Sequence, residues 1–221
     1  DPRKPKECTK TASFDGIKSS KIFWLQNLNW IGATGFSKKG QRLMKFWDLK
    51  KPSALLHEVD LGQQFQILVP NYDNDLGVIY LYEKGGSTVW YGEIINDKKK
   101  YYPIKLFRDN NIQKGGNWLP KRFLNTTKCE IQKFYKITKD TVIPVTFYCP
   151  RKTGAEVFQD DIYPNCFSGK PAFKNNTEWI NGENKDPLLM SMDPDKILAN
   201  ADDNTDTEFK VDDTPSNNNT K

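Results

Sequence analysis

The 221-residue sequence contains a single histidine, His57, and lacks the motifs that most enzymes need. Catalytic Ser/His, Cys/His and zinc sites mostly require at least one well-placed imidazole. His57 lies in an alternating segment that is typical of a strand, so an outward-facing, non-catalytic role is the default. The sequence also has no G-x-G-x-x-G and no G-x-x-x-x-G-K-[ST] phosphate-binding motif. These absences favour a non-enzymatic protein without a cofactor.

Long hydrophobic runs and paired cysteine motifs are also missing. Apolar stretches such as residues 78–82 are far shorter than the roughly 20 residues of a membrane-spanning helix. Cys8, Cys129, Cys149 and Cys166 include no C-x-x-C pair or zinc-site spacing, so we predict ordinary buried or half-buried thiols. The even cysteine number and three Asn-X-Thr triplets leave an extracellular protein open, but we favour the cytoplasm.

Charge is distributed unevenly along the chain, which has 33 basic and 28 acidic residues. Eight acidic residues and only three lysines lie after residue 192, which leaves a net charge of +10 on the first 192 residues. A basic body of this kind attracts acidic partners such as an actin filament, an anionic membrane or a nucleic acid. Residues 194–221 have no apolar heptads and predict a disordered acidic linker or tail.

Three similar aromatic segments recur around Phe46, Trp90 and Phe134, which are spaced 44 residues apart. This spacing lies in the range of roughly 40–45 residues of a propeller blade. Alternating aromatic and branched residues around each segment predict four strands per unit, with the glycine pairs 85–86 and 115–116 in turns. The predicted strands span residues 21–25, 30–36, 42–47 and 55–60, then 65–69, 78–83, 88–94 and 102–107, and finally 117–120, 123–126, 130–137 and 142–148.

An ordered series of motifs resembles the coronins, a WD-repeat family of the actin cytoskeleton. Trp47-Asp48 is weak by itself, because such dipeptides are common. Segments after the last predicted blade are more specific: F-Q-D-D-I-Y-P at 158–164, E-W-I at 178–180 and P-L-L at 187–189. The resemblance runs from Asp1 to about Met192. It implies an all-β fold, a partial WD-repeat β-propeller with about three of seven blades and an irregular carboxyl-terminal extension.

The predicted organisation follows from this resemblance and from the strand pattern. Three blades cannot close a ring, because a propeller closes only when its last blade meets its first. The start at Asp1, without an apolar leader, further favours a fragment. We predict the end of a preceding blade at 1–11, blades at 12–54 and 55–100, a closing blade at 101–152, an extension packed on the propeller at 153–193 and the acidic segment at 194–221.

The resemblance implies a non-enzymatic scaffold that binds filamentous actin and organises the cell cortex for motility, endocytosis and phagocytosis. A generic WD-repeat platform that does not bind actin is the alternative. An enzyme, or a binder of phosphoinositides and other acidic membrane lipids, that uses the basic surface is a third hypothesis, and nucleic acid is not an expected partner. Coronins usually end in a coiled coil that contacts the actin-nucleating complex. The sequence does not support that partnership, because it has no apolar heptads here.

Basic residues in or beside the predicted connections between strands are the candidate contacts with a partner, because a propeller presents its contacts there. The pair Lys121 and Arg122 has a structural alternative, in which it binds carboxylates at the rim of a blade. A segment beginning at Asp73 resembles the start of a calcium loop, but Lys84 stands where the closing glutamate belongs. We therefore predict a hairpin turn there and no metal site. The candidate contacts are Lys38, Lys39, Arg42, Lys98, Lys99, Lys100, Lys121 and Arg122.

Overall fold

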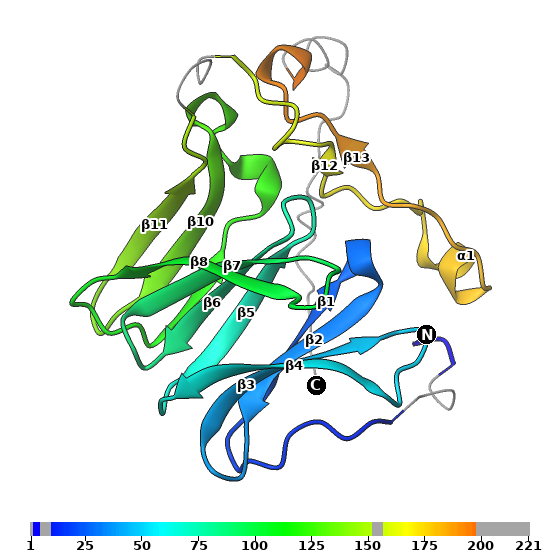
Figure 1. The fold of residues 1–221 in the computed structure, drawn as a ribbon. Helices are drawn as coiled ribbons and strands as arrows, with labels where there is room; N and C mark the ends of the chain where they lie inside the picture. The colour runs from blue at the N-terminus through cyan, green and yellow to red at the C-terminus, as the bar shows by residue number, and fades with distance from the viewer. Residues whose placement is uncertain (1, 5–9, 152–156, 198–221) are drawn as a thin grey trace, which may run out of the picture.

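The computed structural model describes residues 2–4, 10–151 and 157–197. Within them the chain forms three consecutive antiparallel sheets and one two-stranded sheet. Figure 1 shows the three larger sheets side by side, with no closure into a ring. The predicted all-β, partial-propeller class is therefore confirmed. The predicted acidic tail lies almost entirely outside the described residues, and the predicted domain boundaries stay predictions.

Each large sheet is a simple up-and-down meander, in which strands that are consecutive in sequence are neighbours. The first sheet holds β1 (Lys21–Leu25), β2 (Trp30–Phe36), β3 (Gln41–Asp48) and β4 (Leu55–Gln63). The second holds β5 (Ile67–Asp73), β6 (Val78–Lys84), β7 (Thr88–Ile94) and β8 (Tyr101–Arg108). The third holds β9 (Gly115–Trp118), β10 (Glu130–Ile137) and β11 (Val142–Tyr148), and the two-stranded sheet pairs β12 (Cys166–Phe167) with β13 (Leu189–Met190).

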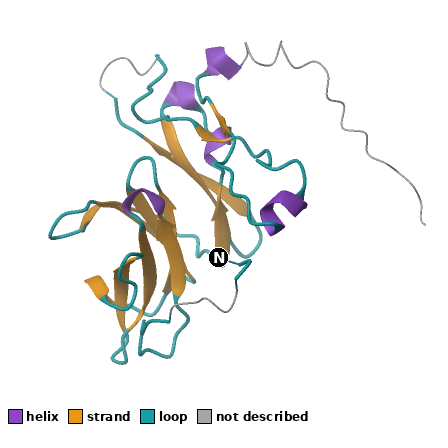
Figure 2. Cartoon of the chain, turned by 90° about the vertical axis from the view of Figure 1, so that its right-hand side faces the viewer, coloured by secondary structure: helices purple, strands orange, loops and turns teal. Residues whose placement is uncertain are grey.

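The described helices are short and lie outside the three large sheets, and the last of them, at residues 194–197, follows β13 (Figure 2). The 3-10 helix η1 (Gln26–Leu28) joins β1 to β2, and the five-residue α1 (Asn176–Ile180) lies in the extension. The other two 3-10 helices, η2 (Lys121–Phe123) and η3 (Thr126–Lys128), occupy the connection between β9 and β10. None of the described helices is long and apolar enough to cross a membrane.

The prediction of a strand at 123–126 is wrong, because η2 ends at Phe123, η3 begins at Thr126, and the two residues between them are not in a strand. Pro120 precedes η2 with φ −58°, and Cys129 ends η3 in the left-handed region with φ 52°. A short apolar run such as Phe123-Leu124 cannot be distinguished from a turn by periodicity alone. The described part of the third sheet therefore contains three strands.

The 44-residue repeat corresponds to equivalent strands in only two of its three copies. Phe46 lies on β3 and Trp90 on β7, which are the third strands of their sheets, whereas Phe134 lies on β10, the second strand of its sheet. The prediction that all three positions are equivalent is wrong. The number of residues repeats but the strand position does not, because β9 and β10 are joined by the long segment 119–129.

The sheets pack face to face, and strand β6 contributes to the core on both of its sides. Its residues Ile79 and Leu81 pack with the first sheet, whereas Tyr80 and Tyr82 pack with the third. This division follows from the two-residue side-chain period of a strand. The ring centroids of Tyr82 and Phe134 lie 4.9 Å apart. Burial on both faces explains why β6 is an almost continuous apolar run rather than an amphipathic strand.

Glycine at position 116 is required by close packing, and the prediction of a turn at 115–116 is wrong. Both glycines lie in β9, which pairs with β10. A Cβ atom on Gly116 would lie 2.3 Å from Cζ of Phe134. The absence of a side chain therefore lets the Phe134 ring lie directly against the β9 backbone.

The extension packs against the end of the third sheet through a separate apolar cluster. Ile162, Tyr163 and Met192 from the extension meet Leu124 and Cys129 in this cluster. The Tyr163 hydroxyl donates a hydrogen bond of 2.9 Å to the backbone oxygen of Glu130. Arg3, near the other end of the chain, donates to the backbone oxygen of Trp179 at 3.1 Å. The extension is thus held by contacts with segments far away in the sequence.

Candidate functional site

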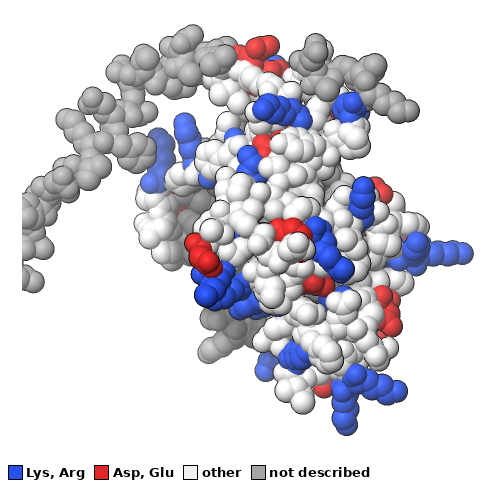
Figure 3. All heavy atoms as spheres, turned by 90° about the vertical axis from the view of Figure 1, so that its left-hand side faces the viewer, with Lys and Arg blue, Asp and Glu red and all other residues white. Residues whose placement is uncertain are grey.

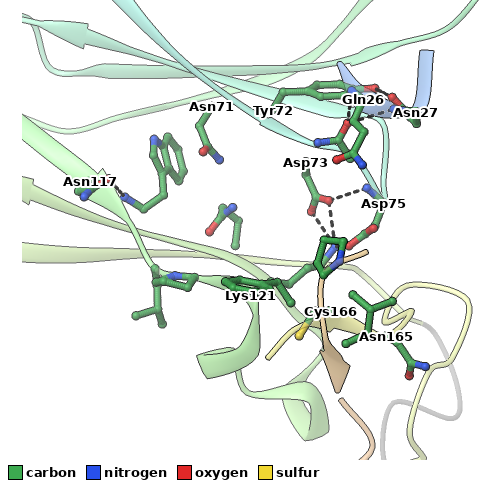
Figure 4. Close-up of a pocket in the computed structure, with 18 residues that line it drawn as sticks. Gln26, Asn27, Asn71, Tyr72, Asp73, Asp75, Asn117, Lys121, Asn165 and Cys166 are labelled. Atoms are coloured by element: carbon green, nitrogen blue, oxygen red, sulfur yellow. Dashed lines mark hydrogen bonds and ion pairs between the residues drawn. The ribbon is translucent and has the colours of Figure 1, made fainter. Parts of the chain in front are cut away.

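A cleft of about 860 Å³, lined mostly by polar residues, opens between the three sheets and the extension. Figure 4 shows it from inside, with the turn after β5 on one wall and the segment after β9 on the other. Residues of η1 and of β12 and β13 complete its lining. The cleft therefore gathers segments that lie up to about 160 residues apart in the sequence.

The turn between β5 and β6 is built by Asp73, as the hairpin prediction requires. Its Oδ1 accepts the backbone N–H groups of Asp75 at 3.0 Å and Leu76 at 3.3 Å. Gly77 closes the turn with φ 68°, a left-handed conformation that glycine adopts without strain. These local hydrogen bonds fix the carboxylates of Asp73 and Asp75 at the edge of the cleft (Figure 4).

The ammonium group of Lys121 occupies the space between these carboxylates. Its Nζ lies 2.9 Å from Oδ1 and 3.1 Å from Oδ2 of Asp73, and 2.6 Å from Oδ2 of Asp75. The Lys121 ammonium thus occupies the carboxylate oxygens that a metal ion would need as ligands. Among the described residues, no group of three or more His, Cys, Asp or Glu side chains is arranged to hold a metal ion.

The rest of the lining is unusually rich in primary amides. Asn74 Oδ1 accepts the backbone N–H of Gln26 at 2.6 Å, and the Tyr72 hydroxyl donates to Asn27 Oδ1 at 3.1 Å. Burial raises the pKa of Tyr72, the charge of Asp73 adds to this, and the Asn27 contact opposes it. Each amide offers both a donor and an acceptor, as a peptide group does. The lining amides are Gln26, Asn27, Asn71, Asn74, Asn117, Gln132 and Asn165.

Arg42 is buried between the first two sheets. Its Nη1 lies 3.0 Å from Oε1 of Glu83, and only 3% of the Arg42 side chain is exposed. Trp90 Nε1 donates to the same carboxylate oxygen at 3.1 Å. The Arg42 guanidinium is predicted to contact a partner, but it is buried and binds Glu83 inside the protein. Arg42 is therefore not among the partner contacts proposed below.

The remaining lysine clusters lie at opposite ends of the sheets. Lys38 and Lys39 are exposed in the β2–β3 turn, and Lys98 and Lys99 are exposed in the β7–β8 loop. Successive turns of a meander alternate between its two ends, so the β7–β8 loop shares an end with the β5–β6 turn. The β1–β2 connection lies at that same end, because Asn74 contacts Gln26. The structure does not gather these lysines into one surface.

The other predicted basic contacts have internal partners. Lys100 donates to the backbone oxygen of Asp97 at 2.7 Å, and its ammonium lies 4.9 Å from the Trp30 ring centroid. Arg122 is half-buried and packs over the Phe123 ring at 4.5 Å. Figure 3 shows basic side chains spread over one face of the molecule, with acidic side chains beside some of them. That face carries no single basic patch.

Several known proteins have sequences and folds similar to those of this chain. A profile described as a type of WD40 repeat matches residues 142–187. Coronin-2A of Homo sapiens is 36% identical over 189 residues, which cover 85% of this chain and 35% of that protein. Coronin-A of Dictyostelium discoideum is 31% identical over 192 residues, which cover 87% of this chain and 42% of that protein. The chain is a coronin homologue.

The coronin fold is matched as well as the coronin sequence. The crystal structure of the WD40 domain of Toxoplasma gondii coronin superimposes with a TM-score of 0.74 at 28% identity, over 82% of this chain and 47% of that one. The predicted resemblance to coronins is therefore confirmed. The chain spans 35% to 42% of the length of these two curated coronins.

Sequence analysis missed the amide-lined cleft of this coronin homologue. Asn71, Asn74 and Asn117 lie at or beside strand ends, where polar residues are ordinary turn formers. Their convergence depends on how neighbouring sheets pack. The one available signal was the clustering of Asn and Asp at residues 71–75, which the hairpin interpretation already explained.

Proposed function

We propose that this chain is part of a non-enzymatic scaffold that binds filamentous actin and helps to organise the cortical cytoskeleton in motility, endocytosis and phagocytosis. The observation that carries the proposal is the coronin similarity over 85% of the chain. The net charge of +10 on the first 192 residues supports it, because a basic body is attracted to an acidic filament. Residence in the cytoplasm at the cell cortex follows from the same function.

The exposed lysines Lys98 and Lys99 are the leading candidate contacts. They lie beside each other in one loop, and none of the ion pairs of the described residues involves them. Lys38 and Lys39 form a second exposed pair at the opposite end of the sheets. Because the two pairs lie at opposite ends of the sheets, we expect one of them to dominate binding to a filament.

Cosedimentation with actin filaments tests this proposal. We expect the protein to pellet with filaments at low salt and to bind less at raised salt, since long-range charge attraction is screened. Flotation with vesicles that contain acidic phospholipids tests the membrane alternative with the same sample. Binding to vesicles without binding to filaments would replace the actin proposal by the membrane one.

A peptide-binding platform is the second candidate function, and the amide-lined cleft favours it. A cleft of about 860 Å³ has room for a few residues of a peptide, and side-chain amides pair well with peptide groups. Asn71 points into the cleft (Figure 4). Peptides selected from a random library on the protein are expected to lose binding to an Asn71→Leu variant. Equal binding to the variant and the unaltered protein would exclude the cleft as the site.

A further inference from the structure

Cys129 and Cys149 lie opposite each other where the β10–β11 ladder ends. Glu130 pairs with Tyr148, and one residue further the Cys149 N–H donates to the backbone oxygen of Cys129 at 2.9 Å. Cys129 precedes β10 with φ 52° and lies outside the ladder, but this backbone hydrogen bond brings the two Cα atoms to about the 5.5 Å of a hydrogen-bonded pair. A disulfide spans Cα separations of about 4.4–6.8 Å. The backbone therefore already holds the two cysteines at a bridging distance.

The two side chains also share one environment. Cys129 is a buried member of the apolar cluster beneath the extension, and Cys149 packs against that cluster. Because Cys129 has a left-handed backbone with φ 52°, this common cluster, rather than strand alternation, brings the two thiols together. Closing a bond between the sulfurs thus requires side-chain rotation and no exchange of strands.

Access to this pair is asymmetric. Only 2% of Cys129 is exposed, whereas Cys149 is partly exposed. Cys149 lines a second open groove, of about 850 Å³, beside β8 and β11. A small oxidant therefore reaches Cys149 first.

We propose that Cys129 and Cys149 form a reversible intramolecular disulfide when the protein meets hydrogen peroxide. The Cys149 thiolate attacks one peroxide oxygen, the O–O bond breaks, and the products are a sulfenic acid and, after protonation, one water. The Cys129 thiolate then attacks the Cys149 sulfur and displaces the hydroxyl as a second water. Two thiols are oxidised by two electrons and one peroxide is reduced to two waters.

The bond ties the point where the chain leaves β11 to the start of β10. It cross-links the ends of a hairpin of 21 residues, from 129 to 149, and so restricts the unfolded chain. We expect the oxidised protein to unfold at a temperature about 5 °C or more above that of the reduced protein. In a reducing compartment such a bond is transient and serves as a redox response.

Peptide mapping by mass spectrometry tests the proposal on the unaltered chain. Trypsin places Cys129 in the peptide 129–133 and Cys149 in the peptide 140–151, because lysines lie at 128, 133 and 139 and an arginine at 151. After peroxide treatment we expect these two peptides to be joined, and dithiothreitol to separate them. Either cysteine joined to Cys166 or Cys8 instead, or a lone sulfinic acid at Cys149, would overturn the proposal.

Substitutions sharpen this test. Cys166 belongs to the same cluster, so Cys166→Ala is the matched control and is expected to leave the 129–149 link unchanged. Cys149→Ala is expected to abolish the link and to leave Cys129 open to alkylation after unfolding. Loss of the link in Cys166→Ala would also contradict the proposal. The peptide map of the unaltered chain decides the matter even if a variant fails to fold.

Discussion

The Lys121 ammonium lies 2.9 Å and 3.1 Å from the two carboxylate oxygens of Asp73. This contact joins η2 in the connection between β9 and β10 to the β5–β6 turn, across 48 residues of sequence. Only 5% of the Asp73 side chain is exposed, so its charge depends on Lys121 for compensation. The pair therefore fixes the geometry of the cleft and links the second sheet to the third.

Removing the ammonium should destabilise the fold. We expect Lys121→Met to lower the free energy of unfolding by about 3 kcal/mol, because it leaves a buried carboxylate without its cation. Urea unfolding at neutral pH measures this. Lys128→Met is the matched control, since Lys128 is exposed in the same connection, and should change stability by less than about 0.5 kcal/mol. Equal effects of the two substitutions would contradict the role of Lys121.

The Arg42–Glu83 pair should behave as a coupled unit. We expect Arg42→Met to lower the free energy of unfolding by about 3 kcal/mol, because Glu83 loses a buried partner. The double variant Arg42→Met/Glu83→Gln should lose clearly less than the sum of the single variants, since the neutral amide needs no cation. Urea unfolding of all four proteins completes the cycle. Strict additivity would show that the two side chains are not coupled.

Charge reversal at one end of the sheets should weaken binding to filaments. We expect Lys98→Glu/Lys99→Glu to weaken binding to actin filaments roughly tenfold at low salt, because it reverses the local attraction. Lys38→Glu/Lys39→Glu makes the same charge change at the opposite end and is the control. Cosedimentation over a range of actin concentrations measures both. The same loss in both variants would assign binding to net charge, and no loss at 98–99 would remove this loop from the site.

Acid should weaken the fold through Asp109. Its carboxylate accepts from Lys136 Nζ, which lies on β10, and from the Asn111 N–H at 3.1 Å. Burial opposes ionisation of this carboxyl, but these hydrogen bonds and the Lys136 charge outweigh it and hold the pKa of Asp109 below its ordinary value. The folded pKa is thus below the unfolded one, so this stabilisation is present above about pH 4 and is lost as the pH falls further.

Asp109→Asn tests this linkage. We expect the variant to lose about 2 kcal/mol at neutral pH and to show a shallower fall of unfolding free energy on acidification. Asp140→Asn, in the exposed β10–β11 turn, is the control and should leave the acid limb unchanged. If the free energy of unfolding of Asp109→Asn falls as steeply on acidification as that of the unaltered protein, Asp109 is not the origin of the acid sensitivity.

Residue patterns predicted most of the strands but not their three-dimensional relations. Alternation located β6 and β7 almost to the residue, because each packs a two-residue period against its neighbours. It failed at residues 123–126, where a short apolar run forms helical turns. It also failed at the third aromatic copy, since counting residues does not reveal the longer connection before β10.

The sequence likewise predicts the exposure of some candidate contacts and not the burial of others. Exposure of Lys38 and Lys98 follows from their places in polar connections, which the sequence shows. Burial of Arg42 cannot be predicted in this way, because nothing in the sequence indicates that Glu83, 41 residues away, lies beside it. An arginine near a turn and an arginine between two sheets have the same local pattern.

The sequence by itself determined the all-β class, the coronin relationship and the basic body, since these depend on residue types and on order along the chain. Only the tertiary structure decided that Lys121 neutralises Asp73, that seven amides line one cleft and that Cys129 and Cys149 share one apolar cluster. These relations depend on how the sheets pack and on the register between β10 and β11. Both are set by contacts between distant residues that no local pattern encodes.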